Sequence, residues 1–461
     1  MSRRLYFIFI IIHLSQSLLG QVCVGVDSLD NSKQLLRKGN FYGHARSFWM
    51  FTDNQAGLTD SYAWGVGAGV GYQTPRIAKH FQVGLSGFFL ANLLSSKIST
   101  PDPKTGQANR YEVGLFDVTK PSQTSNLNRL EELNLRYFFG KNSVVTLGRQ
   151  LPKTPFINPQ DGRLSPTFVE GIVLEWNELK NTRIHAEYLY RISPRSTVGW
   201  YSIGESFGLY PVGLSTDGKP SGYAGNIQTK GILTGGITQN TGPLSLQFWN
   251  TYVENVFNTA FFQGEWKSSL KNKKRWIAGL QAVRQQAVDN GGNSDPAKSY
   301  FPTNSKSAVF SGRIGYRSPL WDVNLNATRI TAEGRYLVPR EWGKEPFYTF
   351  MPRERNEGMG DTQSYSTNIF FKPTSQLKWE ASWGYYKLSD VKNVLLSKYG
   401  MPSYTQLNLG VNYAFAGVLT GLSAQLLVVR KNSIGTTYGN DRFVYNKVNM
   451  SHLNFIVNYQ F

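Results

Sequence analysis

The chain has 461 residues, of which 14% are aromatic and only 17% charged, with one cysteine and a formal net charge of +19. A charged fraction below the roughly 25% of an average soluble domain, combined with many aromatic residues, is unlike an ordinary soluble protein. The single cysteine excludes a disulfide framework, and the lack of a linker-like composition shift favours one large β architecture over several domains.

The N-terminus has the pattern of a secretory signal peptide. Arg3 and Arg4 precede an apolar run, Leu5 to Ile12, and small residues follow up to Gly20. We therefore assign residues 1–20 to the signal, residues 21–39 to an N-terminal periplasmic segment and residues 40–461 to the folded domain. After the signal no apolar run reaches 18 residues, which excludes helical membrane spans.

The segment from Tyr62 to Tyr72 predicts a strand that crosses a membrane. Its apolar face begins and ends with aromatic residues, while the other face consists of Ala63 and four glycines. Aromatic ends with small aliphatic residues between them are typical of a lipid-facing strand and its two aromatic girdles. Because the glycine face lacks side chains, a loop folded into a barrel could approach the backbone there.

Similar alternation recurs along the whole chain and predicts about eighteen strands of roughly ten residues. The predicted segments are 40–52, 61–73, 81–94, 129–140, 143–150, 168–176, 182–191, 227–239, 244–254, 258–268, 274–286, 306–317, 320–331, 364–372, 376–388, 403–415, 421–431 and 447–461. Alternation alone also fits a soluble β protein with an apolar core. The number of segments, their length and their aromatic ends favour an antiparallel transmembrane barrel, with long loops outside and short turns in the periplasm.

The stretch Gly148 to Gly171 interrupts this pattern with four prolines, so it cannot be a central strand. Phe156, Ile157, Leu164 and Phe168 suit a loop that packs against other parts of the protein, and long ordered loops are usually functional. Such a loop would present Asp161, Arg163 and Ser165 at fixed positions. Asn158 and Ser165 could contact a solute, or could simply form hydrogen bonds within the loop.

The same region carries a family resemblance. Leu133 to Tyr137, Leu147-Gly148-Arg149, Thr154-Pro155-Phe156 and the run DGRLSPTFVEG from Asp161 to Gly171 resemble the OprD family of outer-membrane porins. The resemblance implies an eighteen-strand barrel whose loop 148–171 folds inward and narrows the pore. It also implies that Arg163 faces the passing substrate, and that the substrates are small solutes that often bear a carboxylate.

Strand parity places several basic residues on the lumenal face, namely Arg46, Arg136, Arg183, Arg313 and Lys378. A basic channel concentrates and steers anions. Acidic residues such as Glu132, Glu187 and Glu380 share that face, so we expect some of these cations to be paired. The excess charge would also suit nucleic acid, but the export signal argues against such a partner.

The last strand, Asn449 to Phe461, alternates and ends in phenylalanine, which resembles the signal by which outer-membrane barrels are recognised for assembly. The loop 289–304 carries Asp289 and Asp295 among asparagines and could bind Ca²⁺, although it lacks the bidentate glutamate of an EF-hand. Arg340, Arg353 and Arg355 in the 333–361 loop could bind lipopolysaccharide phosphates, attract solutes or be simply solvated.

The sequence therefore predicts a passive, selective porin in the outer membrane of a Gram-negative bacterium, with no cofactor, metal or catalytic activity. The expected cargo is small anionic or zwitterionic solutes such as amino acids or short peptides. The expected partners are outer-membrane lipid and lipopolysaccharide, the barrel assembly machinery and, as one option, two further copies in a homotrimer. Two alternatives stay open: an oligosaccharide-selective porin of the same fold, and a surface-binding barrel that acts as receptor or adhesin.

Overall fold

The computed structural model describes residues 39–159, 163–268, 271–353 and 355–461. The predicted signal peptide, nearly all of the segment 21–39 and the predicted loop residue Asp161 lie outside the described residues. The strands are β1 (Asn40–Asp53), β2 (Ser61–Gln73), β3 (Phe81–Ser95), β4 (Leu127–Phe139), β5 (Ser143–Gln150), β6 (Phe168–Trp176), β7 (Thr182–Ser193), β8 (Tyr201–Ser202), β9 (Ile232–Thr241), β10 (Leu244–Val253), β11 (Phe257–Lys267), β12 (Arg275–Ala287), β13 (Lys306–Arg317), β14 (Trp321–Ile330), β15 (Thr362–Phe371), β16 (Leu377–Lys387), β17 (Tyr404–Ala414), β18 (Leu422–Ser433) and β19 (Met450–Gln460).

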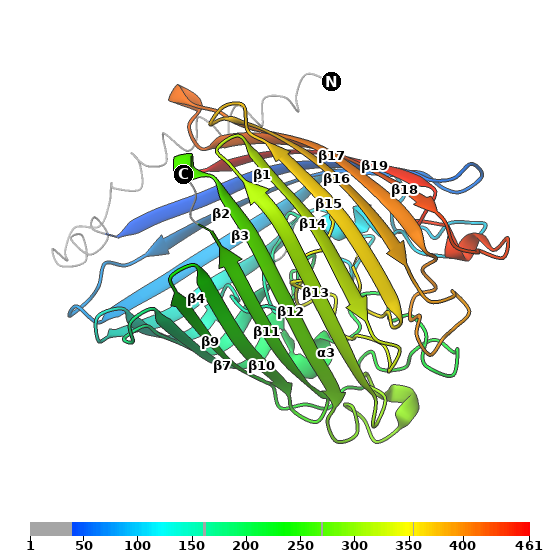
Figure 1. The fold of residues 1–461 in the computed structure, drawn as a ribbon, viewed down its shortest axis with the longest axis horizontal. Coiled ribbons are helices and arrows are strands. Elements are labelled where there is room, and N and C mark those ends of the chain that lie inside the picture. The colour runs from blue at the N-terminus through cyan, green and yellow to red at the C-terminus, as the bar shows by residue number, and fades with distance from the viewer. Residues whose placement is uncertain (1–38, 160–162, 269–270, 354) are drawn as a thin grey trace.

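Eighteen of these strands form one closed antiparallel barrel (Figure 1). Each pairs with the next, β7 pairs directly with β9, and β19 pairs with β1. The two-residue strand β8 pairs only with the end of β7 and is not one of the strands that form the barrel wall. Closure leaves no strand edge with unpaired backbone groups, which is the condition for crossing a membrane with strands.

The predicted fold class and all eighteen predicted segments are confirmed, with ends shifted by a few residues. The largest difference is at 227–239, because β9 begins only at Ile232. Gln228 donates its backbone N–H to the carbonyl of Gly292 in another loop, and Gly231 has a φ of 149° that a strand does not adopt. Residues 227–231 therefore belong to a loop.

The helices are short. They are α3 (Ile203–Ser206) and the 3-10 turns η1 (Glu112–Leu115), η2 (Lys271–Lys273), η3 (Pro296–Lys298), η4 (Gly417–Leu419) and η5 (Asp441–Phe443). Among the described residues no helix has the length and apolar character needed to cross a membrane.

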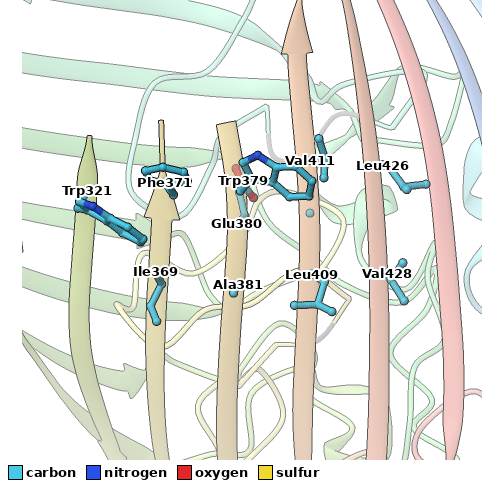
Figure 2. Close-up of a pocket in the computed structure, with 11 residues that line it drawn as sticks. Trp321, Ile369, Phe371, Trp379, Glu380, Ala381, Leu409, Val411, Leu426 and Val428 are labelled. Carbon is cyan, nitrogen blue, oxygen red and sulfur yellow. The ribbon is translucent and has the colours of Figure 1, made fainter. Parts of the chain in front are cut away.

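The apolar residues of the alternating strands face outward. Figure 2 shows part of this outer wall across β14 to β18, where Trp321, Phe371, Trp379 and Leu409 project from the strands. Exposure is high even for large side chains, reaching 68% for Phe89 and 70% for Leu280. An apolar surface of this extent is stable when lipid covers it, so the tertiary structure decides between the membrane barrel and the soluble β protein.

The inside of the barrel is filled at one end by loops. The long connections, 96–126, 151–167, 194–231, 288–305, 331–361, 388–403 and 434–449, all lie at the same end, together with the short connections 54–60 and 254–256. The remaining short turns lie at the other end. The loops contribute to three buried apolar clusters, which contain Phe156 and Phe347, Ile157 and Trp342, and Leu164 with Leu115. The lumen is therefore narrowed from the long-loop end.

The C-terminal residue completes the closure of the barrel. The backbone groups of Phe461 and Gly43 exchange two hydrogen bonds of 3.1 Å, and the Phe461 ring occupies the space that a side chain at position 43 would need. We expect Phe461→Asp to lower the amount of folded barrel in the membrane, because the β1–β19 seam loses the packing of the phenylalanine ring against Gly43. The measurement is the fraction with altered gel mobility before boiling, and a normal fraction would show that this residue carries no assembly information.

Candidate functional site

Three inward loops meet against the wall formed by β1 and β19. They are the β3–β4 loop (96–126), the β5–β6 loop (151–167) and the β14–β15 loop (331–361). Arg163 donates from Nη1 to the carbonyl of Tyr111 at 2.8 Å, and the Tyr111 hydroxyl donates to the carbonyl of Arg353 at 3.2 Å. These contacts join all three loops at one point, which we call the loop junction and which is the candidate constriction of the channel.

The β5–β6 loop is held inside the barrel by packing and by hydrogen bonds. Phe156 is 2% exposed and meets the ring of Phe261 edge-on at 5.6 Å, and Ile157 is fully buried. Asn158 forms two side-chain bonds with the backbone of Lys344, of 3.0 and 3.2 Å. The predicted inward loop is therefore present in the structure, and Asn158 ties it to the β14–β15 loop.

Ser165 has a similar role on the other side. Its hydroxyl donates to the carbonyl of Thr197 at 3.3 Å, and its own carbonyl accepts from the N–H of Ser196 at 3.2 Å. Ser165 is 2% exposed. Both bonds have protein partners, so Ser165 helps to hold the loop in place. A contact of Asn158 or Ser165 with a solute stays a prediction.

The glycine face of β2 gives the loops their space. A Cβ added at Gly65 would lie 2.6 Å from Cδ1 of Leu164 and 3.1 Å from the ring of Phe116. Leu164 belongs to the β5–β6 loop and Phe116 to the β3–β4 loop. The absence of a side chain at Gly65 thus lets both loops reach the barrel wall, as the sequence pattern predicts.

Arg163 lies inside the loop junction. Its side chain is buried, the residue being 7% exposed, and its backbone has a φ of 24°. Its carbonyl accepts a hydrogen bond from Nη1 of Arg46, and its guanidinium fills the space beside Gly114. The resemblance implies a substrate-facing arginine, whereas the observed contacts join loops, so its direct contact with a solute stays a prediction.

Two further arginines, Arg46 and Arg353, lie beside Arg163. Arg46 on β1 is half-buried and donates from Nε to Oδ1 of Asn458 at 2.5 Å. Arg353 is also half-buried and donates from Nη2 to Oδ1 of Asn454 at 2.7 Å. Both asparagines lie on the inner face of β19. The wall therefore orients two guanidinium groups at the edge of the loop junction.

A buried acidic residue, Glu112, lies inside the loop junction. The carboxylate of Glu112 accepts from the Thr52 hydroxyl at 2.5 Å and from the side-chain amide of Asn109 at 2.7 Å. Thr52 also lies 2.7 Å from Nδ1 of His452. Burial raises the pKa of Glu112, and the nearby Arg163 opposes that rise. The loop junction thus combines basic groups at its edge with an acidic group held inside it.

The remaining predicted cations lie on the lumenal face but are not brought together. Arg136 pairs with Glu132 at 3.7 Å, Arg313 with Glu265 at 2.6 Å, and Lys378 with Glu380. Arg183 is exposed near the short turn 177–181 and donates to Asn177 at 3.3 Å. Three of these four basic residues therefore pair with an acidic residue, as expected for some of them.

Sequence reasoning missed three residues of the loop junction, namely Tyr111, Glu112 and His452. For Arg353 it left three roles open: binding of lipopolysaccharide, attraction of solutes, or simple solvation. The structure places Arg353 in the lumen, where it contacts Asn454. No local signal identifies these residues, because their positions depend on how long loops fold into the barrel.

In the loop 289–304, calcium binding stays a prediction. Asp295 accepts from the N–H of Ala297 at 3.0 Å and so caps the turn η3. The described residues contain no group of three or more His, Cys, Asp or Glu that could hold a metal ion.

A second set of buried charges, which we call the outer cap, ties the long loops together. Lys398 is 2% exposed, lies 3.4 Å from the carboxylate of Glu357 and sits over the rings of Tyr223 and Tyr300 at 4.9 and 4.7 Å. Arg335 donates to the carbonyl of Leu214 at 2.6 Å. These contacts connect the loops 194–231, 288–305, 331–361 and 388–403, so the outer cap closes part of the barrel mouth.

The outer cap should loosen as the pH rises. Glu341 accepts from the N–H of Gly208 at 2.8 Å, and burial raises its pKa from 4.5 to about 7, with Lys398 opposing and Glu357 adding to the rise. The folded state therefore holds the proton more tightly than the unfolded state, and stability falls as the pH rises from about 4.5 to about 7.

We expect amides in 203–208 and 337–342 to exchange hydrogen faster at pH 8 than at pH 5, after correction for the intrinsic rates. The Glu341→Gln variant should lose this difference, because its side chain is neutral at both pH values. An equal pH effect in the variant would assign the dependence to another group.

Comparison with known proteins agrees with this geometry. Residues 122–315, which include the β5–β6 loop, match the family model described as outer membrane porin, OprD family. Over these residues the chain is similar to the OprD family of outer-membrane porins. The resemblance predicted from the sequence of this loop is thereby confirmed.

Solved structures show the same barrel. OccK9 (OpdG) of Pseudomonas aeruginosa superposes with a TM-score of 0.72 at 14% identity, covering 92% of this chain and 99% of that one. OccAB2 of Acinetobacter baumannii gives 0.72 at 12%, covering 93% and 98%. OpdK of Pseudomonas aeruginosa, solved with vanillate, gives 0.67 at 15%, covering 93% and 99%. No curated protein matches the chain. These porins share the fold of this chain. At 12–15% sequence identity, the similarity is evidence for the fold alone.

Proposed function

We propose that this porin is a selective channel for passive uptake of small solutes that bear a carboxylate, such as amino acids or short peptides. The observation that supports this proposal is the loop junction, where Arg46 and Arg353 lie half-exposed beside Arg163. Arginine binds a carboxylate through two parallel hydrogen bonds, and a basic lumen of low dielectric attracts anions. The similar barrel OpdK was solved with vanillate, itself a carboxylate.

The other basic residues of the lumen are less suited to bind an anion. Arg136, Arg313 and Lys378 each have a carboxylate partner and contribute little net field. Arg46 and Arg353 lie half-exposed at the edge of the loop junction, where they donate to the side-chain oxygens of Asn458 and Asn454. The proposal therefore places anion recognition at these two guanidinium groups.

The two alternatives have weaker support. Sugar binding would use lumenal aromatic surfaces, yet Tyr386, Tyr404 and Phe48 are each 2–3% exposed because the loops pack on them. A receptor or adhesin would use free outer loops, whereas Lys398 and Arg335 tie these loops into the outer cap. The proposal also includes passive transport without catalysis, recognition of the C-terminal strand by the assembly machinery, and contact with lipopolysaccharide. A homotrimer stays a prediction.

Single-channel recording in planar bilayers tests the proposal, together with liposome flux of benzoate, benzamide and maltotriose. We expect a reversal potential that shows anion preference, and faster flux of benzoate than of benzamide. Faster flux of maltotriose than of benzoate would favour the oligosaccharide porin. Absence of conductance from correctly folded protein would favour the surface-binding barrel.

A further inference from the structure

A row of polar side chains crosses neighbouring strands on the inner wall of the barrel. Register pairing places its members side by side on β7, β9, β10, β11 and β12, and they are Glu187, Thr234, Thr251, Thr259 and Gln285. We call these residues the polar row, and all of them are buried. The Cβ atoms of directly paired residues lie about 4.5–5.5 Å apart, so one small ligand can contact the side chains of neighbours.

Protein groups satisfy the half of the polar row on β11 and β12. Gln285 donates from Nε2 to the Thr259 hydroxyl at 2.9 Å and to the carbonyl of Leu337 at 2.6 Å. Its Oε1 accepts from the N–H of Leu337 at 2.9 Å. The β14–β15 loop therefore completes the hydrogen bonds of this half.

The other half of the polar row has unpaired oxygens. Glu187, Thr234 and Thr251 are 5%, 3% and 3% exposed. Oε1 of Glu187 and the hydroxyl oxygens of Thr234 and Thr251 are buried and have no hydrogen-bond partner among the described residues. Buried polar atoms nearly always have a partner, so unpaired oxygens on three adjacent strands point to a bound water molecule or ion.

The charge of Glu187 favours an ion over a water molecule. Its Oε2 lies 3.1 Å from Nε2 of His185, and a neutral imidazole can donate that hydrogen bond without supplying charge. In the part of the chain that the structure describes, no arginine or lysine pairs with Glu187. By contrast, Glu132, Glu265 and Glu380 on the same inner wall each pair with arginine or lysine. A buried carboxylate without a positive partner is unfavourable, and a bound cation would remove that cost.

Apolar side chains enclose the unpaired oxygens along the strands. Towards the long loops the next inward residues are Leu189, Ile232 and Val253, and each is fully buried. Towards the short turns the ring of Trp249 lies over Gly236, where an added Cβ would meet it at 2.2 Å. Water therefore has little access to this half of the polar row from either direction along the wall.

The β5–β6 loop spans the polar row. Ile157 belongs to the same apolar cluster as Leu189 and Val253 on the long-loop side of the row. Phe156 belongs to the same apolar cluster as Trp249 on the short-turn side. An ion held by the row would therefore lie beneath the loop that narrows the channel.

We propose that Glu187, Thr234 and Thr251 bind one monovalent inorganic cation, such as Na⁺, between the barrel wall and the β5–β6 loop. Hard cations take oxygen ligands, and the single negative charge of Glu187 matches a monovalent ion, whereas calcium sites use several carboxylates. The ion neutralises Glu187 and connects β7, β9 and β10 under the loop. Its release loosens the loop. The site lies in the wall of the barrel and is independent of which solute the channel transports.

Hydrogen exchange of the folded porin in detergent tests this proposal, with NaCl replacing choline chloride at constant ionic strength. The readout is the segment 154–158, where Ile157 donates its N–H to the Thr154 hydroxyl at 3.2 Å and Asn158 donates to the carbonyl of Trp342 at 3.3 Å. Opening of the loop releases the ion, so Na⁺ should slow exchange in a saturable way, about tenfold at about ten times its dissociation constant. Choline is too large for a buried site. Exchange that does not depend on Na⁺ would overturn the proposal and leave water as the occupant.

Three variants locate the effect. Glu187→Gln should abolish the dependence on Na⁺, because it removes the charge and keeps the side-chain volume. Thr251→Val keeps the charge and should weaken Na⁺ binding about tenfold, the ratio expected for loss of one contact with a charged group. The matched control is Glu380→Gln, which removes a lumenal carboxylate that pairs with Lys378 and should respond to Na⁺ as the native protein does.

Two outcomes with these variants would contradict the site. One is an undiminished Na⁺ response in Glu187→Gln. The other is an unchanged Na⁺ midpoint in folded Thr251→Val, which decides the question by itself if Glu187→Gln does not fold.

Discussion

Deleting residues 152–163 and bridging the gap with glycine and serine is expected to raise single-channel conductance at least about twofold, because conductance follows the open cross-section of the pore. The deletion removes Phe156 and Ile157, which anchor the loop in two apolar clusters, and Arg163, which joins it to Tyr111. The barrel itself should persist. Gln150 and Val169 pair directly across β5 and β6, so a short linker can join these strands without changing their register.

Selectivity should fall together with the rise in conductance, since solutes would no longer pass the loop junction. The control replaces Asp295 to Lys298 by glycine and serine at equal length, because no residue of the turn η3 is buried. That variant should conduct as the native channel does. If the deletion variant folds but conducts normally, the β5–β6 loop does not form the constriction.

The second large effect is expected from Arg46→Gln combined with Arg353→Gln. Glutamine preserves much of the side-chain volume and removes two positive charges from the edge of the loop junction. Focused fields in clefts change local ion concentration and association rates by 10-fold or more, so we expect carboxylate flux to fall about tenfold. The reversal potential in a salt gradient should move towards zero, while total conductance changes little.

Two comparisons make this result specific. Arg284→Gln with Arg329→Gln removes the same charge from the outward face and should leave anion preference unchanged. Arg163→Gln should reduce anion preference less than the Arg46 and Arg353 pair, because Arg163 is 7% exposed. It should instead loosen the contact with Tyr111 and make the conductance noisier. Retained anion preference in the double variant at Arg46 and Arg353 would remove these two groups from the selectivity mechanism.

The sequence by itself determined the strands of the barrel and which side chains each strand places on its two faces. A strand exposes alternate residues to lipid and to the lumen, so a two-residue period with aromatic ends is visible in each segment without knowledge of its neighbours. The eighteen segments, the inward position of Arg46 and the space beside Gly65 all followed from this local pattern. The four prolines likewise excluded a strand at 148–171, because proline cannot donate to the ladder.

Only the tertiary structure decided how the loops fill that barrel. Tyr111, Arg163 and Arg353 come from three loops far apart in the chain, and their contacts have no period that a sequence can display. For the same reason the sequence could not choose between the possible roles of Arg353, and it did not show the contacts that bury Arg163. Strand faces are fixed by local backbone geometry, whereas a loop's position is fixed by which distant side chains bury it.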